Sequence, residues 1–147
     1  MIEIRKIGSH DIHRLDLLVE ESVREGFRHL TRLVNEYASG VNRFGKDGEA
    51  LFMAMRNKEV VGVCGGLNRD PFTAGKERGR VRRLYTSPSA RRSGIGRKLM
   101  QAVMIEARKH YKCLTLKTDN PAADAFYRSL GFQVISGSDT DTHVIFF

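Results

Sequence analysis

The chain contains few of the residues that stabilise very small or secreted domains. It has 147 residues with two cysteines, three prolines and no tryptophan. Cys64 and Cys113 lack the paired spacing of a zinc site or of a disulfide framework. A chain of this length buries about two-thirds of the surface that it exposes when unfolded, so its core needs no such staple. We therefore expect one domain over residues 1–147, with both thiols buried and reduced.

Long apolar segments are also missing. No run approaches the ~18–20 apolar residues that a membrane-spanning helix needs. The N-terminal residues 1–6 lack the continuous apolar core of a signal peptide. These absences predict a cytoplasmic protein that enters no membrane.

Acidic residues are outnumbered by basic ones. Lys and Arg total 25 against 17 Asp and Glu, which gives a formal net charge of +8. Such an excess attracts anionic partners, including nucleic acid, an acidic surface or a phosphorylated cofactor. We expect one basic stretch to contact phosphate, and its members are Lys76, Arg78, Arg80, Arg82, Arg83, Arg91, Arg92, Arg97 and Lys98.

Apolar periodicity predicts a mixed order of strands and helices. Strands are expected over residues 2–6, 50–55, 60–67, 80–86, 114–118, 132–135 and 143–147. Helices are expected over residues 12–23, 27–37, 97–109 and 121–130. The polar residues 56–59 join two of the strands in a predicted antiparallel hairpin. The sequence shows no internal repeat and no interdomain linker.

The segment Arg91-Arg92-Ser93-Gly94-Ile95-Gly96-Arg97 lies between a predicted strand and a predicted helix. Its two glycines allow the backbone to approach an anion closely. The first amides of a helix have no intrahelical acceptors and lie at the positive end of its dipole. The segment therefore predicts a phosphate-binding loop, and a turn with a solvated basic rim is the alternative.

Two other phosphate-binding motifs fit this segment poorly. A Walker A loop needs Gly-Lys-Ser/Thr, whereas Arg97 follows Gly96. A dinucleotide fingerprint needs a third glycine where Leu99 stands, although Asp119 lies near the expected ribose-binding position. In that fingerprint the strand runs almost directly into the first glycine, whereas residues 87–93 intervene here. NAD binding is therefore disfavoured.

Together with residues downstream, this loop resembles that of the GNAT N-acetyltransferases. In that family an acetyl-CoA loop Arg/Gln-x-x-Gly-x-Gly/Ala follows a strand and precedes a helix. A strand, an Asn, a short helix bearing Tyr, and Leu-Gly-Phe then follow. The matching residues are Arg91-x-x-Gly94-x-Gly96, Leu114 to Thr118, Asn120, Phe126-Tyr127 and Leu130-Gly131-Phe132. The resemblance covers roughly residues 80–133, and the N-terminal half agrees in element order only.

The resemblance implies a single-domain α/β fold and acetyl-CoA as cosubstrate, with no metal. The expected mixed, mostly antiparallel sheet has six to seven strands, is splayed between strands 4 and 5, and is flanked by about four helices. The pantetheine arm would pair with the backbones of Leu84, Tyr85 and Thr86 in the split. The amide of Leu84 would polarise the thioester carbonyl, which makes Leu84 a catalytic candidate. The expected cofactor-binding residues of the loop are Arg91, Arg92, Ser93, Gly94, Ile95, Gly96 and Arg97.

Two residues of the last predicted helix complete the implied site. Tyr127 matches the tyrosine that protonates the departing thiolate in many members and lies at the cofactor. Its alternative is a core aromatic residue whose hydroxyl binds a carbonyl. Asn120 resembles a residue that binds the pantetheine arm, and helix capping ahead of Pro121 explains it equally well.

No general base is assigned. Some members have a glutamate on the fourth strand, where this chain has Arg80, and an arginine is no base at physiological pH. A base is not always required, because an amine of low pKa attacks once it is positioned. The remaining candidates are Glu20, Glu21, Glu49, Asp70, Glu77, His10, His13, His29 and His143.

The acceptor site is expected among the first two helices, residues 68–78 and the last strands. Arg69, Arg78, Arg80 and His143 would favour an amine that carries a carboxylate or phosphate, unless these charges serve only the cofactor and the surface. We expect an acetyl-CoA-dependent N-acetyltransferase that acts on a primary amine by direct attack through a tetrahedral intermediate. A non-catalytic acetyl-CoA sensor and, less favoured, a basic nucleic-acid-binding module are the alternatives; the basic stretch interleaves only Tyr85 as an aromatic. The acceptor's identity and the oligomeric state, a homodimer included, stay open.

Overall fold

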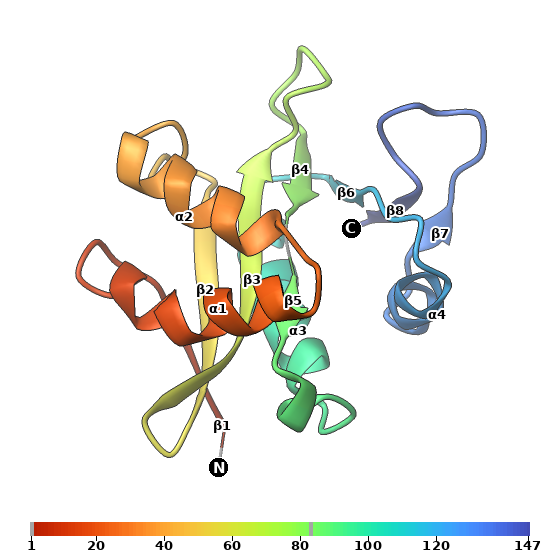
Figure 1. Cartoon of the computed structure of the whole chain (residues 1–147). Helices are drawn as coiled ribbons and strands as arrows, with labels where there is room; N and C mark the ends of the chain where they lie inside the picture. The colour runs from red at the N-terminus through yellow and green to blue at the C-terminus, as the bar shows by residue number, and fades with distance from the viewer. Residues whose placement is uncertain (1, 83) are drawn as a thin grey trace.

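A mixed β-sheet with helices on both faces organises residues 2–82 and 84–147, the part of the chain that this computed structural model describes (Figure 1). The strands are β1 (Ile2–Lys6), β2 (Ala50–Arg56), β3 (Glu59–Arg69), β4 (Arg78–Val81), β5 (Tyr85–Thr86), β6 (Cys113–Leu116), β7 (Gln133–Val134) and β8 (His143–Phe146). The α-helices are α1 (Asp16–Arg24), α2 (His29–Ser39), α3 (Ile95–Arg108) and α4 (Pro121–Ser129). The predicted fold class is confirmed.

Local sequence explains the central hairpin. Asn57 and Lys58 have φ angles of 52° and 69°, so two consecutive residues are left-handed between β2 and β3. This conformation is typical of the tight turns whose twist matches that of paired strands. The antiparallel register runs through Arg56 and Glu59, as predicted.

The sheet is covered on both faces, which explains why β2 is apolar at almost every position. Phe52 and Ala54 belong to one buried cluster, with α3 residues such as Leu99 and Val103. Leu51 points to the other face and packs with residues of α1 and α2. Alternate side chains of a strand face opposite sides, so a strand buried on both sides needs a continuous apolar run.

The sheet separates on one side of β5. The parallel pairing of β4 with β6 ends at Arg80 and Thr115. Beyond this point β5 pairs with β3, and within the described residues no strand pairs with its other edge. In Figure 1, β6, β8, β7 and α4 diverge from β5 and α3. The predicted fourth strand, residues 80–86, corresponds to β4 and β5, and the predicted fifth strand corresponds to β6. The predicted splay is therefore present, between β5 and β6.

Two sequence-based expectations change in detail, and the expected burial of Cys113 is found. The strand predicted over 80–86 is two strands, β4 and β5, so the sheet has eight described strands instead of six to seven. The first predicted helix begins as a short 3-10 turn over Ile12–Leu15. Cys113 is a buried free thiol whose pKa is raised by burial. Arg83 and the side chain of Cys64, both part of our predictions, lie outside what the structure describes.

Candidate active site

The loop before α3 presents a row of backbone amides. Arg92 and Gly94 have positive φ angles of 64° and 82°, and Gly94 is the N-cap of α3 without any side-chain capping bond. The first helical hydrogen bond runs from the amide of Lys98 to the carbonyl of Gly94, at 3.1 Å. The amides of residues 92–97 have no acceptor among the described residues. A helix start with unsatisfied amides and open space at Gly94 is suited to bind an anion.

Successive side chains of residues 84–86, which precede this loop, lie on opposite faces of the sheet. Tyr85 is buried among residues of α1 and α2, whereas the half-buried Leu84 packs against the α3 cluster. A Cβ at Gly96 would lie 3.9 Å from the Thr86 hydroxyl oxygen, so Thr86 faces the start of α3. The amide of Leu84 lies where β4 and β5 separate and has no acceptor among the described residues. The backbone of residues 84–86 thus lines the split, as the resemblance implied.

Arg91 does not extend freely toward the anion site. Its Nη1 and Nη2 donate to the two carboxylate oxygens of Glu25 at 2.9 and 2.7 Å, and its Nε donates to the carbonyl of Thr86 at 3.1 Å. The Tyr85 hydroxyl donates to Glu25 at 2.6 Å. The hydrogen bond from Arg91, followed by that from Tyr85, lowers the pKa of Glu25. Burial, and then the hydrogen bond to Glu25, raises the pKa of Tyr85. Arg91 therefore ties the loop to the end of α1.

The other basic residues of the loop differ from Arg91. The side chain of Arg92 is exposed at the turn. Arg97 donates to the Ser129 hydroxyl at 2.7 Å and so joins the start of α3 to the end of α4. The Ser93 hydroxyl donates to the carbonyl of Ala90 inside the turn, and Ile95 is buried. The loop's side chains mainly hold its shape, while the amides of residues 92–97 have no acceptor among the described residues.

Helix α4 begins and packs as its sequence suggests. The Asn120 side chain accepts a hydrogen bond from the amide of Ala122 at 2.9 Å, which confirms its capping role. Tyr127 is 7% exposed, and its ring lies 5.7 Å from that of Phe132. Tyr127 and Leu84 contact the same hydrophobic cluster, although they belong to opposite sides of the split. Both predicted catalytic residues therefore contact one extended hydrophobic cluster, and their catalytic roles stay predictions.

His143 lies beside Tyr127 and is held at both ring nitrogens. Its Nε2 is 2.7 Å from the Asp124 carboxylate, and its Nδ1 is 2.8 Å from the Thr142 hydroxyl. The His143 and Tyr127 rings are 5.9 Å apart. The hydrogen bond with His143, followed by that with Arg128, lowers the pKa of Asp124. His143 therefore supports α4. Asp124 was not among the residues predicted from the sequence, although its spacing of three residues from Tyr127 places both on one helix face.

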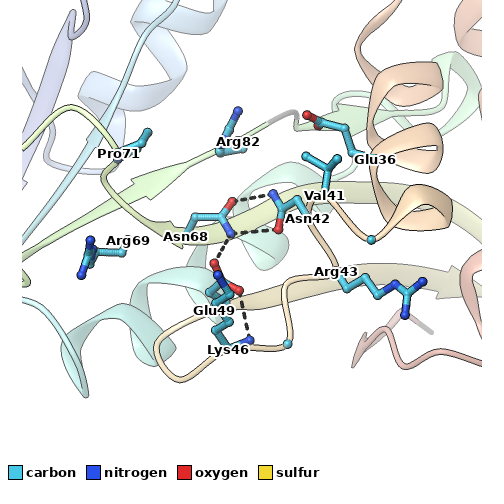
Figure 2. Close-up of a pocket in the computed structure, with 12 residues that line it drawn as sticks. Glu36, Val41, Asn42, Arg43, Lys46, Glu49, Asn68, Arg69, Pro71 and Arg82 are labelled. Carbon is cyan, nitrogen blue, oxygen red and sulfur yellow. Dashed lines mark hydrogen bonds between the residues drawn. The ribbon is translucent and has the colours of Figure 1, made fainter.

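A polar cavity lies on the α2 side of the sheet, away from the loop (Figure 2). Its volume is about 460 Å³. At its centre Asn42 and Asn68 exchange two amide hydrogen bonds, at 3.1 and 3.2 Å, and Asn68 also donates to Glu49 at 2.7 Å. The polar side chains that line it include Glu36, Asn42, Glu49, Asn68, Arg69 and Arg82. Sequence reasoning named Glu49 and Arg69 but missed Asn42 and Glu36.

Comparison with known proteins agrees with this geometry. The sequence model of the Acetyltransferase (GNAT) family matches residues 12–132. The chain belongs to this family. A presumed acetyltransferase from Exiguobacterium sp. 255-15 shares 32% identity and a TM-score of 0.88, and the match covers 99% of this chain and 93% of the other. No curated protein sequence matches the chain.

Two more distant GNAT-like structures share the fold. The PaiA N-acetyltransferase of Thermoplasma acidophilum, solved with coenzyme A, matches at 20% identity and a TM-score of 0.68, over 100% of this chain and 99% of the other. A ribosomal-protein-alanine N-acetyltransferase from Brucella melitensis matches at 22% identity and a TM-score of 0.72, over 97% and 96% of the two chains. Acetyl-CoA is the donor that this family uses.

In this GNAT chain the position of the family's strand glutamate forms part of a buried ion-pair cluster. Arg80 is 8% exposed, and its Nη1 lies 2.6 Å from Asp141 and 3.8 Å from Asp70. Its Nη2 donates to the carbonyl of Thr140 at 2.5 Å. Arg78 lies 3.5 Å from the other Asp141 oxygen. The two arginines are thus balanced by two aspartates. The charge of Arg80, expected at an acceptor pocket or at cofactor phosphates, is matched by acidic side chains, and its long-range partner Asp141 had no local sequence signal.

The other candidates for a base lie apart from the split. His10, His13 and Glu20 are exposed, and Glu77 pairs at the surface with Lys112. Glu21 accepts a hydrogen bond from Tyr85 at 3.3 Å on the α1 side. Among the described residues, no three His, Cys, Asp or Glu side chains gather as metal ligands. No helix in the described ranges has the length and apolarity to cross a bilayer.

Proposed function

We propose that this GNAT acetyltransferase, a single domain over residues 1–147, transfers acetyl from acetyl-CoA to a primary amine by direct attack. One observation carries the proposal. The open edge of β5 is followed, after a short turn over residues 87–91, by the unsatisfied amides of residues 92–97, so a strand-like arm and a pyrophosphate would be bound by neighbouring segments. This arrangement matches an elongated cosubstrate with phosphates at one end.

Binding in this orientation positions the acetyl group. The amides of residues 92–97 would hold the pyrophosphate at the positive end of α3. The backbones of Leu84, Tyr85 and Thr86 would pair with the pantetheine amides, as a strand edge pairs with another strand. Fixing both parts of the cosubstrate places the thioester near Leu84 and so lowers the entropic cost of reaction.

The chemistry then needs two groups of this chain. Acetyl-CoA supplies the acetyl group as a thioester. As the amine nitrogen attacks the carbonyl carbon, the amide of Leu84 would donate to the oxygen of the tetrahedral intermediate, where negative charge develops. The hydroxyl of Tyr127 would give its proton to the sulfur when the carbon–sulfur bond breaks, and the nitrogen gives up a proton in forming the amide.

Titration of the purified protein with acetyl-CoA tests the binding part, and Gly94 offers a matched pair of variants. Gly94→Asp and Gly94→Asn have the same shape and both tolerate a φ of 82°, but only Asp adds a charge. We expect one-to-one binding that weakens with salt, and about tenfold or more weaker binding for Asp than for Asn, because of charge repulsion. Equal affinities of the two variants would overturn the phosphate site.

A second candidate is an acetyl-CoA sensor without turnover. Arg80 at the glutamate position favours it, because its paired guanidinium supplies no base. Acetyl-CoA-dependent thiol release with a panel of amines separates the two functions. Nucleic-acid binding gains no support, because Arg78, Arg80 and Arg91 of the basic stretch are already paired with carboxylates.

A further inference from the structure

The polar cavity lies next to the place where the thioester is proposed to lie. Arg82 lines the cavity, and Leu84 follows it by two residues. Two residues of extended chain span about 7 Å at most. The phosphate-binding loop begins after β5, in the opposite direction along the chain. The cavity is therefore adjacent to the reacting end of the proposed cosubstrate and lies away from its phosphates.

The centre of the cavity is a fixed carboxylate. Asn68 is 5% exposed, and its amide nitrogen donates both to Asn42, at 3.2 Å, and to Glu49 Oε2, at 2.7 Å. The amide of Lys46 donates to Glu49 Oε1 at 3.0 Å. Figure 2 shows these side chains converging from β3, from the segment before β2 and from the segment after α2. An amide network of this kind holds the Glu49 carboxylate in one orientation.

The Glu49 carboxylate makes no ion pair among the described residues. Both recorded donors to Glu49 are neutral groups, and among the described residues no cationic side chain lies within ion-pair distance of it. An ionised carboxylate has about four acceptor positions, so two remain for a ligand. Arg43 donates to the Tyr37 carbonyl at 3.0 Å, and its guanidinium lies away from the centre in Figure 2. Glu36 adds a second carboxylate to the wall.

We infer that this cavity is the acceptor site and that Glu49 binds the ammonium group of a small, polar primary amine. This inference rests on the proposed acetyl transfer. The cavity's ≈ 460 Å³ lies in the size range of small-molecule sites. Asn42 and Asn68 present amide groups to hydroxyl or carbonyl groups on such a molecule. Four cationic side chains also line the cavity, so its wall does not exclude an amine that carries its own carboxylate.

Acceptor kinetics with matched probes test this assignment. Ethanolamine and serinol are compared with glycine and serine, in which a carboxylate replaces a hydroxymethyl group. Acetyl-CoA-dependent thiol release identifies the best acceptor of the four. With the best probe, Glu49→Gln should raise KM for the amine about tenfold or more while KM for acetyl-CoA stays the same, because a charge-assisted bond is lost. Glu59→Gln, at the exposed β2–β3 turn, is the control and should change neither value.

Binding can be followed without turnover. The side-chain amide resonances of Asn42 and Asn68 should shift when ethanolamine or serinol is added to the coenzyme A complex of the wild-type protein, and should shift much less in Glu49→Gln. An unchanged KM for the amine in Glu49→Gln would overturn the assignment.

The experiments distinguish a wrong acceptor assignment from a wrong proposed function. If acetyl-CoA binds but no probe is acetylated or shifts the Asn42 and Asn68 resonances, the acceptor assignment is wrong and cosubstrate binding stands. If acetyl-CoA itself does not bind, the proposed function is wrong. Titration of the free protein with ethanolamine or serinol then tests whether the cavity binds an amine. If the Asn42 and Asn68 resonances do not shift, the assignment of the cavity as an amine site is wrong.

Discussion

The two ends of the segment from β4 to β5 are built in different ways. After β5, the proposed anion site consists of consecutive residues, 92–97, whose backbone amides have no acceptor among the described residues. Before β5, the polar cavity is assembled from Asn42, Glu49, Asn68 and Arg82, which belong to separate segments. A site made of consecutive residues leaves a local pattern in the sequence. A site assembled across elements does not, and its charge balance is visible only in three dimensions.

Two arginines of the basic stretch also depend on partners that are distant in the sequence. Arg91 pairs with Glu25, 66 residues away, and Arg80 pairs with Asp141, 61 residues away. Both acids lie outside the stretch, so a count of charges along the sequence overstates how basic its surface is. The net charge of +8 therefore says little about which arginines are available to a ligand.

The largest effect is expected from breaking the Arg80 cluster. Arg80→Met would leave the fully buried Asp70 without its cationic partner and Asp141 with only the more distant Arg78. Removing one member of a buried ion pair costs about 3–5 kcal/mol. The free energy of unfolding, measured by urea denaturation, should fall by about that amount.

Arg78→Met is the control for that variant. Arg78 lies 3.5 Å from the same Asp141 but is one-third exposed, so its loss should cost about 1 kcal/mol or less. Equal losses for the two variants would show that the position of the buried charge is unimportant. The sequence-based view of a basic surface at Arg80 would then be restored.

Much of the fold follows from local sequence, and the exceptions have a common cause. The hairpin at Asn57, the start of α4 at Pro121 and the apolar stripe of α3 depend on residues close in sequence, and each was predicted. The break of the fourth strand after Val81 was not. It depends on where β6 diverges from β4, which is a property of tertiary packing rather than of residues 80–86.

The next largest effect concerns the proposed acid. Tyr127→Phe keeps the ring that packs beside Phe132 and His143 but removes the hydroxyl. Positioned acids contribute about 100-fold or more to rate, so kcat should fall by about that factor while acetyl-CoA affinity stays the same. Steady-state kinetics and calorimetric titration measure the two quantities.

Tyr111→Phe is the matched control. Tyr111 is also buried, and its hydroxyl donates to the carbonyl of Gly48 at 2.6 Å. Its loss should reduce stability by about 1 kcal/mol and leave kcat unchanged. If Tyr127→Phe behaves like Tyr111→Phe, Tyr127 is a core residue and the alternative considered from the sequence is correct.

The candidate site was predictable to different extents on its two sides. Gly94 and Asn120 lie in motifs with a local mechanism, a helix start and a helix cap, and the structure shows both. The Asp124–His143 pair and the Asn42–Asn68 pair join residues 19 and 26 positions apart. Nothing in the local pattern of a histidine or asparagine names such a partner, so these pairs required the fold.

The smallest effect is expected from weakening the contact between Glu25 of the α1 end and Arg91 of the loop before α3. Glu25→Gln weakens the bond between α1 and Arg91, and because the backbone amides carry the phosphate site, acetyl-CoA affinity should change by less than about threefold. About tenfold tighter binding would instead make the released Arg91 a phosphate ligand. The pKa of Glu25 is lowered by Arg91 and Tyr85, so its stabilising contribution is complete above its ordinary value of 4.5 and is lost as pH falls through the lower folded value. The difference in thermal stability between wild type and Glu25→Gln should therefore be present at neutral pH and disappear in acid, and a difference that persists in acid would mean that the contact does not depend on the charge of Glu25.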